Sequence, residues 1–530
     1  MIRLTQFKLP ADHTPDAMKK KAAKMLKISP DAIRRVHIRK QSLDARKKPE
    51  LFYSYTIDVE VNGSEQSIVH KAKSPDVSIA KEKKYQFPQS GEETMQHRPV
   101  IIGSGPAGLF CGLMLARHGY QPILLERGED VETRRQKVDH FWETGTLDLR
   151  SNVQFGEGGA GTFSDGKLNT LVKDPLSRNQ LVMEILHEFG AGEEILYQNK
   201  PHIGTDVLSG IVKHIREEII RLGGTVRFGC QVTDLCIEQG HMTGVVTEDG
   251  EMFPTEAVVL AIGHSARDTF EMLLGHGIPM EQKAFAVGLR IQHPQKLINL
   301  SQYGREDAGN LGAASYKLTK QTSTGRGVYS FCMCPGGYVV NASSEEGRLA
   351  VNGMSYNDRA GVNANSALIV TVTPDDFPDD SPLGGVAFQR ELERLAYEAA
   401  DGKVPVQLYG DFKRDQISAA LGEVEPQIKG AWAFADLRSV MPEALNQSMI
   451  EAMESFGHMI HGFDREDVVF AGIESRTSSP VRIWRNETFE SEIQGLYPCG
   501  EGAGYAGGIT SAAMDGVKVA EAIARRYRPF

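Results

Sequence analysis

The sequence lacks the features of a secreted or membrane-spanning protein. Only six of its 530 residues are cysteines, too few and too scattered for a disulfide scaffold. No apolar run approaches the roughly 18 residues that a membrane-spanning helix needs. The first eight residues, MIRLTQFK, contain no apolar core of signal-peptide length. We therefore expect a cytoplasmic protein with reduced thiols and no membrane partner.

Repeats and low-complexity tracts are also absent, which leaves no sign of a repeat protein. Apolar residues make up 41% of the chain and charged residues 24%, which is ordinary for a globular protein with large cores. At roughly 100–200 residues per domain, a chain of 530 residues predicts two to four domains.

The charge of the chain is unevenly distributed. Its net charge of −10 argues against a polyanion-binding role for the protein as a whole. Residues 1–90 nevertheless hold 19 Lys+Arg against 10 Asp+Glu, whereas the rest of the chain holds 40 against 59. A segment with a net charge of +9 thus precedes a body with a net charge of −19.

The patterns within this basic segment predict a small α+β unit of βαββ order. Thr14 followed by Pro15 is typical of a helix start, and residues 74–97 lack an apolar period and indicate mostly a linker. Alternating apolar residues favour strands at 1–8, 33–40 and 51–61.

A strand, a glycine-rich loop and a helix follow one another after Pro99. Val100–Ile102 is typical of a short buried strand, and Gly103–Gly108 carries the spacing G-x-G-x-x-G. A helix then extends to about His118, and a second strand ends at Glu126. This β-loop-α-β order opens a doubly wound sheet and predicts an α/β fold with a Rossmann-type dinucleotide site.

Each glycine of the loop has a physical task in such a site. Gly103 permits the tight turn, Gly105 lets the backbone approach a pyrophosphate at the helix N-terminus, and Gly108 permits close helix–strand packing. Glu126, 18 residues after Gly108, can bind both ribose hydroxyls. The spacing alone does not distinguish FAD from NAD.

Two later glycine-rich stretches favour FAD. Residues 155–168 form a bare backbone that can pass close to a flat ring or a phosphate, or else form a flexible surface loop. A strand and turn at 495–501 lead through 502–508 to a helix that begins near Ile509. The partial positive charge at that helix N-terminus can stabilise an anionic reduced flavin.

This arrangement resembles the FAD-binding fold of glutathione reductase and its relatives. Gly495, Gly500 and Glu501 match the late G-x-x-x-x-G-[DE] motif, whose acid contacts the ribityl–phosphate region in that family. The resemblance also implies that the strand near Val232 offers backbone to the adenine. It further implies that residues 257–263 correspond to the family's ATG strand, with isoleucine in place of threonine.

Four strings scattered over the chain resemble a bacterial family of uncharacterised FAD-dependent dehydrogenases. That resemblance implies FAD and redox chemistry but no particular substrate. The strings are DARKK at 44–48, GAGTFSDGKL at 159–168, FCMCPGG at 331–337 and RTSSPVR at 476–482.

The motifs and resemblances together predict the residues that hold FAD. The predicted residues are Gly103, Ser104, Gly105, Pro106, Ala107, Gly108, Glu126, Arg127, Gly158, Gly159, Ala160, Gly161, Thr162, Lys167, Leu168, Val232, Ala261, Gly263, Gly500, Glu501, Gly508, Ile509 and Thr510.

No second G-x-G-x-x-G lies between a strand and a helix. Either NAD(P)H docks without a domain of its own, as a transient electron donor, or the substrate itself donates the hydride. The order then resembles geranylgeranyl reductases and amino-acid oxidases, in which one substrate domain interrupts the FAD domain. The predicted parts are a basic α+β domain at 1–90, FAD-binding parts at 91–270 and 466–530, and an α+β substrate domain at 271–465.

Four polar residues are catalytic candidates. Arg290 can clamp a carboxylate or phosphate, or form a surface ion pair. His293 can act as an acid or base near pH 7, or be structural. Arg476 and Ser478 belong to a cluster that can bind an anionic substrate or the flavin edge, or form an ordinary polar loop.

Cys332 and Cys334 are the remaining candidates. They can form a redox dithiol, or one thiol can act as a nucleophile if its pKa is depressed. Alternatively, one thiol packs in the core while the other lines the pocket, because cysteines two residues apart on a strand need a strained bridge. No further ligands are spaced for zinc, so we expect no metal.

We therefore expect an FAD-dependent oxidoreductase that transfers a hydride through flavin N5 to or from a small substrate, which the arginine candidates allow to be anionic. One alternative is an FAD-dependent RNA-modifying enzyme that uses the lysine-rich N-terminal helix; the other is a non-catalytic flavin-binding protein. The lysines can equally form a solvated face or dock on the acidic body, so we do not expect nucleic acid as a partner.

Overall fold

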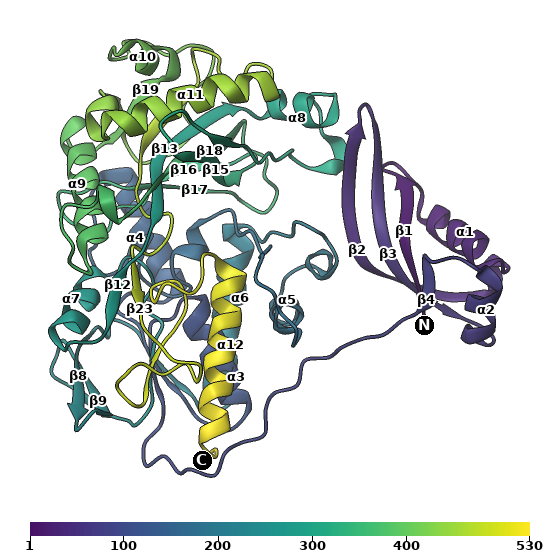
Figure 1. Ribbon diagram of the computed structural model, residues 1–530, viewed down its shortest axis with the longest axis horizontal. Helices are drawn as coiled ribbons and strands as arrows, with labels where there is room; N and C mark the ends of the chain where they lie inside the picture. The colour runs from purple at the N-terminus through teal and green to yellow at the C-terminus, as the bar shows by residue number, and fades with distance from the viewer.

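The computed structural model describes residues 1–530. Figure 1 shows three units: a small N-terminal sheet with two helices, a parallel sheet with helices beside it, and a larger sheet above the parallel one. The protein is thus of mixed α/β class. No helix in it combines the length and the apolar character that crossing a membrane requires.

The N-terminal unit has βαββαβ order, one helix and one strand more than the sequence predicts. Its elements are β1 (Ile2–Pro10), α1 (Pro15–Leu26), β2 (Ile33–Lys47), β3 (Glu50–Val61), α2 (Glu65–Ala72) and β4 (Val77–Ile79). The strands form an antiparallel sheet in the order β2-β3-β1-β4. The sequence pattern misses α2 and β4 because they are short and bury little, and β4 lies within the predicted linker.

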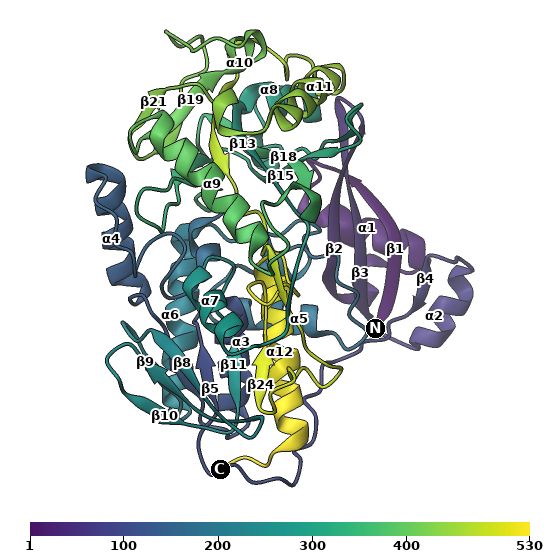
Figure 2. The same ribbon diagram turned by 60° about the vertical axis from the view of Figure 1, so that its left-hand side comes forward.

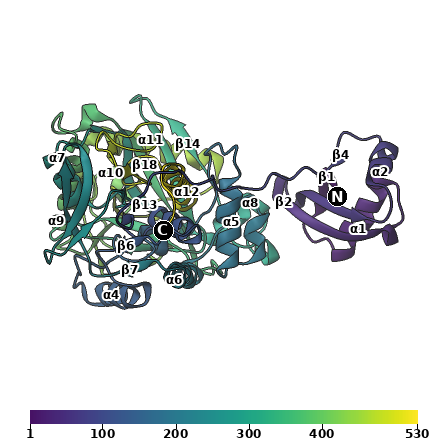
Figure 3. The ribbon, with the colours of Figure 1, turned by 90° about the horizontal axis from the view of Figure 1, so that it is seen from below.

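The β2–β3 hairpin attaches this unit to the rest of the protein. The Gln41 amide donates a hydrogen bond to the Tyr197 carbonyl at 2.7 Å, and the Asn199 amide donates to the Gln41 carbonyl at 2.9 Å. Figures 1 and 3 show α1 on the side of the unit that faces away from the body. The lysines of α1 therefore do not dock on the acidic body; the exposed ones are Lys19, Lys20 and Lys24.

A parallel sheet forms the second unit. Its elements are β5 (Val100–Ile102), α3 (Pro106–Arg117), β6 (Ile123–Leu125), α6 (Thr205–Arg221), β7 (Thr225–Arg227), β11 (Val258–Leu260), β24 (Leu496–Pro498) and α12 (Ile509–Arg526). The five strands run in the order β24-β11-β5-β6-β7, and every neighbouring pair is parallel. The segment from β5 through α3 to β6 is the β-loop-α-β unit that the sequence predicts.

Further elements surround the parallel sheet. Figure 2 shows the three short antiparallel strands beside it and α4 at its outer edge. These elements are α4 (Val131–Thr144), α5 (Arg178–Glu188), β8 (Val232–Glu238), β9 (His241–Thr247), β10 (Met252–Pro254) and α7 (Arg267–Gly275).

The third unit is built on a seven-stranded sheet with a core of 45 buried residues, one of which, Leu51, comes from β3 of the N-terminal unit. Its strands are β13 (Phe285–Pro294), β14 (Thr319–Gln321), β15 (Gly327–Cys334), β18 (Asn363–Val372), β19 (Val404–Leu408), β21 (Trp432–Phe434) and β22 (Val469–Glu474). They follow the order β14-β15-β18-β13-β22-β19-β21. Because β22 belongs to this sheet, the chain returns to the parallel unit only after Glu474, later than the predicted boundary.

One small sheet and four helices complete the third unit. They are β16 (Tyr338–Asn341) with β17 (Val351–Met354) and β20 (Ile428–Lys429), α8 (Gln295–Tyr303), α9 (Gly384–Ala399), α10 (Tyr409–Arg414) and α11 (Glu443–Met459). A two-stranded sheet of β12 (Met280–Gln282) and β23 (Val481–Ile483) packs on the core of the parallel unit.

A buried ion cluster joins the two larger units. The carboxylate of Glu393, on α9, is fully buried and accepts hydrogen bonds at 2.8 Å from Arg267, at the start of α7, and from Arg476, just after β22. Burial by itself raises the pKa of Glu393, but the two guanidinium charges outweigh it and hold that pKa well below its usual range. One ionised carboxylate therefore ties together three segments that are distant in sequence.

Replacing this carboxylate should destabilise the protein. Glu393→Gln removes the anion that both buried arginines share and leaves them only Glu345, which pairs with Arg267 at 2.5 Å and lies 3.7 Å from Arg476. Breaking a buried pair in this way costs about 3–5 kcal/mol. We expect a clearly lower urea midpoint for Glu393→Gln. Glu398→Gln, at an exposed position of the same helix, should change the midpoint little.

The difference in urea midpoint between the wild type and Glu393→Gln should depend on pH. Because the folded-state pKa of Glu393 is depressed, its stabilisation is complete above the ordinary glutamate pKa of about 4.3 and is lost as the pH falls below that value. The difference in midpoint between wild type and Glu393→Gln should therefore narrow in acid. A constant difference would contradict an ionised Glu393.

Candidate functional site

A cavity of about 360 Å³ lies between the parallel sheet and the larger sheet. Its first wall consists of the loops that follow β5, β6 and β11, at the carboxyl ends of the parallel strands, together with the second glycine-rich loop at 154–167 and the start of α12. Its second wall comes from β15, β17 and the end of β22. Ligands of parallel α/β sheets bind at this edge of the sheet.

The first glycine loop is shaped by contacts that leave no room for side chains. Gly103 has a φ of +99°, and a β-carbon there would lie 2.4 Å from the Ala261 carbonyl oxygen. A β-carbon on Gly108 would lie 1.9 Å from the Gly103 carbonyl oxygen. Both glycines are therefore required by the fold itself, in the roles that the sequence predicts.

Gly105 is different, because nothing in the protein requires a glycine there. Its φ of −70° suits any residue, and the nearest atom to an added β-carbon is the Gly159 α-carbon at 3.8 Å. The space in front of Gly105 lies at the N-terminus of α3, where backbone N–H groups lack partners within the helix. This geometry suits a phosphate group, which a side chain at this position would displace.

The second glycine loop is held by Arg134, which the sequence analysis missed. Arg134 lies on α4, and its guanidinium is fully buried. Burial lowers its pKa to about 10, so the group stays charged at neutral pH. Its N–H groups donate at 2.7–2.9 Å to the carbonyls of Asn152, Val153, Glu157 and Gly159. The curled loop thus presents its own glycines to the cavity.

The Glu126 carboxylate already accepts several hydrogen bonds from the protein itself, which the sequence does not indicate. Its carboxylate accepts hydrogen bonds from the Ser104 amide and hydroxyl at 2.9 and 2.8 Å, and from the amides of Gly128 and Gly156 at 2.9 and 3.1 Å. These bonds connect the two glycine loops. Contact with a ribose requires the Ser104 hydroxyl, or another of these donors, to share the carboxylate.

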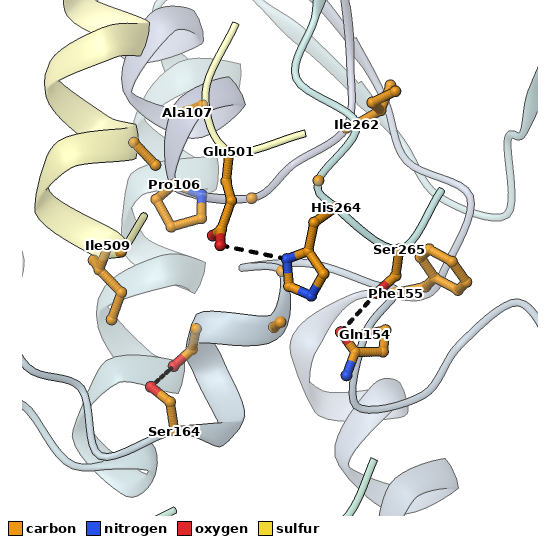
Figure 4. Close-up of a pocket in the computed structure, with 18 of the residues that line it drawn as sticks. Pro106, Ala107, Gln154, Phe155, Ser164, Ile262, His264, Ser265, Glu501 and Ile509 are labelled. Atoms are coloured by element: carbon orange, nitrogen blue, oxygen red, sulfur yellow. Dashed lines mark hydrogen bonds and ion pairs between the residues drawn. The ribbon is translucent and has the colours of Figure 1, made fainter. Parts of the chain in front are cut away.

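A histidine and a glutamate face each other across the first wall (Figure 4). His264 Nδ1 lies 3.5 Å from Glu501 Oε1, and His264 Nε2 is buried without a hydrogen-bond partner. His264 follows directly after the predicted strand and turn at 257–263. That position is the one signal in the sequence from which His264 could have been predicted as a site residue. Glu501 is the acid of the late glycine motif, so the pair lies where the resemblance places the ribityl chain.

The predicted cofactor residues divide into those that line the cavity and those behind them. The lining residues are Gly103, Gly105, Pro106, Ala107, Glu126, Arg127, Gly159, Ala160, Gly161, Lys167, Val232, Ala261, Gly263, Glu501, Gly508 and Ile509. Ser104, Gly108, Gly158, Thr162, Leu168, Gly500 and Thr510 are not part of the lining. Several of these are supports: the Thr510 hydroxyl, for example, donates to the Leu168 carbonyl at 2.7 Å.

His293, Ser478 and Arg476 do not have the surroundings that a catalytic role would need. His293 is fully buried outside the cavity lining, stacks on Phe463 and hydrogen-bonds the Phe463 carbonyl at 2.7 Å. Burial lowers the pKa of His293 to about 4, so the ring is neutral. Ser478 does not reach the cavity. Arg476 does line it, but its charge is neutralised by Glu393.

The two cysteines are arranged as in the last of the three alternatives, with one thiol in the core and the other lining the pocket. Cys332 faces the cavity, whereas Cys334 is buried and its thiol donates to the Cys332 carbonyl at 3.1 Å. Although Cys332 is exposed to the cavity, it lies deep enough that desolvation raises its pKa to about 12. The thiol is therefore neutral, which does not favour a thiolate nucleophile.

Every arginine and lysine that lines the cavity already has a carboxylate partner. Arg127 pairs with Asp268 at 3.0 Å, Lys167 with Asp165 at 2.7 Å, and Arg476 with Glu393 at 2.8 Å. The predicted clamp, Arg290, is fully buried outside the lining and pairs with Glu474 at 3.1 Å. The cavity thus offers an anionic substrate no unpaired cation.

Comparison with known proteins places this chain in a family. An uncharacterized protein of Clostridium beijerinckii is 49% identical over 531 residues, which cover 99% of each chain. The chain belongs to the family of that protein. Residues 284–477 match the family model described as "FAD-dependent protein, C-terminal domain-like", and residues 1–60 match a domain of unknown function, DUF8436.

Similarity to solved structures is weak. A quinol fumarate reductase of E. coli superimposes with a TM-score of 0.37 at 12% identity, over 80% of this chain and 69% of that one. L-proline dehydrogenase from P. horikoshii gives a TM-score of 0.35 at 13% identity, over 82% and 94%. Scores this low carry no argument about function.

Removing the guanidinium that holds the second loop should loosen that loop. Arg134→Met keeps the buried stem but leaves four carbonyls without their donor, and each unsatisfied buried group costs about 1–3 kcal/mol. We expect rapid proteolytic cleavage within residues 152–166. Arg135→Met, at the half-exposed neighbouring position, is the control. Equal cleavage of the two variants would show that Arg134 does not hold the loop.

Proposed function

We propose that this protein is an FAD-dependent oxidoreductase and that FAD occupies the cavity between the two larger units. The observation that carries the proposal is the space in front of Gly105, which the protein leaves free although the backbone there tolerates a side chain. The match of residues 284–477 to a domain of FAD-dependent proteins supports the same cofactor.

The cavity residues suit the successive parts of FAD. The pyrophosphate would lie between Gly105 and Gly159, against the N-terminus of α3. The adenosine ribose would lie toward Glu126, and the ribityl chain toward Glu501 and His264. The flavin ring would then face the second wall, with the N-terminus of α12 beside it.

Bound FAD would supply two-electron chemistry through its N5 atom. The protein itself would orient the cofactor and the substrate and shield them from water. The bare glycine loops admit the cofactor, and the wall from β15, β17 and β22 excludes water and faces the substrate. The cavity residues fit an uncharged substrate better than the predicted anion, because the lining cations are already paired.

A side chain at Gly105 tests the placement of the cofactor. Gly105→Ala should fold normally, because its β-carbon meets no protein atom closer than 3.8 Å. It should nevertheless lose FAD affinity by about 100-fold, because the added methyl group occupies the phosphate position. Gly210→Ala, on α6 with open space around it, is the matched control and should retain FAD. A yellow, fully loaded Gly105→Ala protein would refute the placement.

Anaerobic reduction distinguishes the possible electron donors. If NAD(P)H docks without its own domain, NADH or NADPH should bleach the flavin of the purified protein at micromolar concentration. If the substrate is the hydride donor, both nucleotides should fail while dithionite still bleaches the flavin. A flavin that resists NADH, NADPH and every member of a metabolite panel would instead favour a non-catalytic flavoprotein.

A further inference from the structure

The seven-stranded sheet carries two irregularities where it faces the cavity. On β15 the register shifts between Phe331, opposite Ala367, and Cys334, opposite Asn365, so the strand contains one extra residue. On β22 the register shifts in the same way against β13, just before Glu474. Bulges of this kind redirect side chains and are frequent beside active sites.

Each bulge delivers one side chain to the second wall of the cavity. Cys332 lies within the β15 bulge with a φ of +41°, a conformation that non-glycine residues rarely adopt. Glu474 ends β22, is 4% exposed and lines the cavity. The two residues therefore reach the same wall from strands that are not neighbours in the sheet.

Arg290, on the central strand β13, connects the two bulges. Its Nη1 donates to the Cys332 carbonyl at 3.0 Å, and its Nε lies 3.1 Å from Glu474 Oε2. A β-carbon on Gly353 would lie 2.0 Å from Arg290 Nη2, so that site must be glycine for the guanidinium to fit. Arg290 thus fixes the position of the Glu474 side chain.

The Glu474 carboxylate is not saturated by hydrogen bonds within the protein. Its buried Oε2 is within ion-pair distance of Arg290 but accepts no hydrogen bond of proper geometry, and the residue lines the cavity. Burial raises the pKa of Glu474, which the charge of Arg290 opposes. The thiols of Cys332 and Cys334 are close as well, and burial raises the pKa of each. Among these groups, burial moves the pKa of the carboxyl upward toward neutral pH, whereas it moves the pKa of each thiol further above it.

We propose that Glu474 is the catalytic residue that exchanges the substrate's proton and that Arg290 is its positioning residue, a role that rests on the FAD-dependent function proposed above. The substrate carries a hydrogen on oxygen or nitrogen next to a C–H bond. With FAD bound, the oxidised flavin would accept the hydride as the C–H bond breaks, the Glu474 carboxylate would take the O–H or N–H proton, and a C=O or C=N bond would form. In the reverse direction the protonated carboxyl returns the proton.

The pH dependence of the flavin's two-electron reduction potential tests this role in the flavin-loaded protein. If Glu474 faces the flavin ring, reduction of the flavin raises the pKa of Glu474. At a pH between the Glu474 pKa of the oxidised protein and that of the reduced protein, one additional proton is taken up per two electrons, so the plot of potential against pH bends. The wild type should show this bend and Glu474→Gln should not, whereas Glu474→Asp should keep one. Arg290→Met should move the bend to higher pH, because the opposing charge is gone. Glu248→Gln, an exposed surface change, is the control and should match the wild type.

The outcomes are separable. A Glu474→Gln protein that is fully loaded with FAD and bends as the wild type does would overturn the role of Glu474 while leaving the FAD-dependent function intact. A loaded wild type without a bend would do the same. A wild type that retains and rebinds no FAD would overturn the proposed function, and this proposal with it. Equal FAD content in all variants excludes misfolding as the cause of a lost bend.

Discussion

The site depends on one buried carboxylate, Glu393, and the two arginines that enclose it. Arg267 comes from the parallel unit and Arg476 from the segment that returns to that unit, while Glu393 belongs to a helix of the third unit. Desolvating three charges is costly, and the geometry offsets that cost through four hydrogen bonds at 2.8 Å. The cluster thereby fixes how the second wall stands over the first.

The first wall is built from glycine-rich loops, and buried polar side chains fix the conformation of their backbone. Arg134 holds the second glycine loop through its carbonyls, and Glu126 bonds amides of both loops. The backbone of these loops is bare where the cavity needs room, so its shape cannot come from apolar packing. The buried hydrogen bonds that Arg134 donates and that Glu126 accepts provide it instead.

Local features of the fold were predictable from sequence. The strand before Gly103, the turn and α3 follow from short-range patterns, and the sheet places most of the predicted cofactor residues on one cavity. Elements with little burial, such as α2 and β4, were not predictable, because they leave no apolar period.

The roles of charged residues were the harder part to predict. The sequence allows Arg290, His293 and Arg476 either a substrate contact or a structural role, and the structure gives each a partner in another segment: Glu474, Phe463 and Glu393. Such pairings depend on tertiary contacts that no spacing in the sequence encodes. The strand bulges that expose Cys332 and Glu474 belong to the same category, since a bulge exists only relative to its partner strand.

Equilibrium binding of FAD to the flavin-free protein tests the central claim most directly, because the claim concerns one site that takes both halves of the dinucleotide. It predicts saturable binding of one FAD per chain, with FMN and riboflavin binding far more weakly, since they lack the adenosine that Glu126 and Val232 would contact. No saturable binding, or equal affinity for FAD and riboflavin, would contradict it.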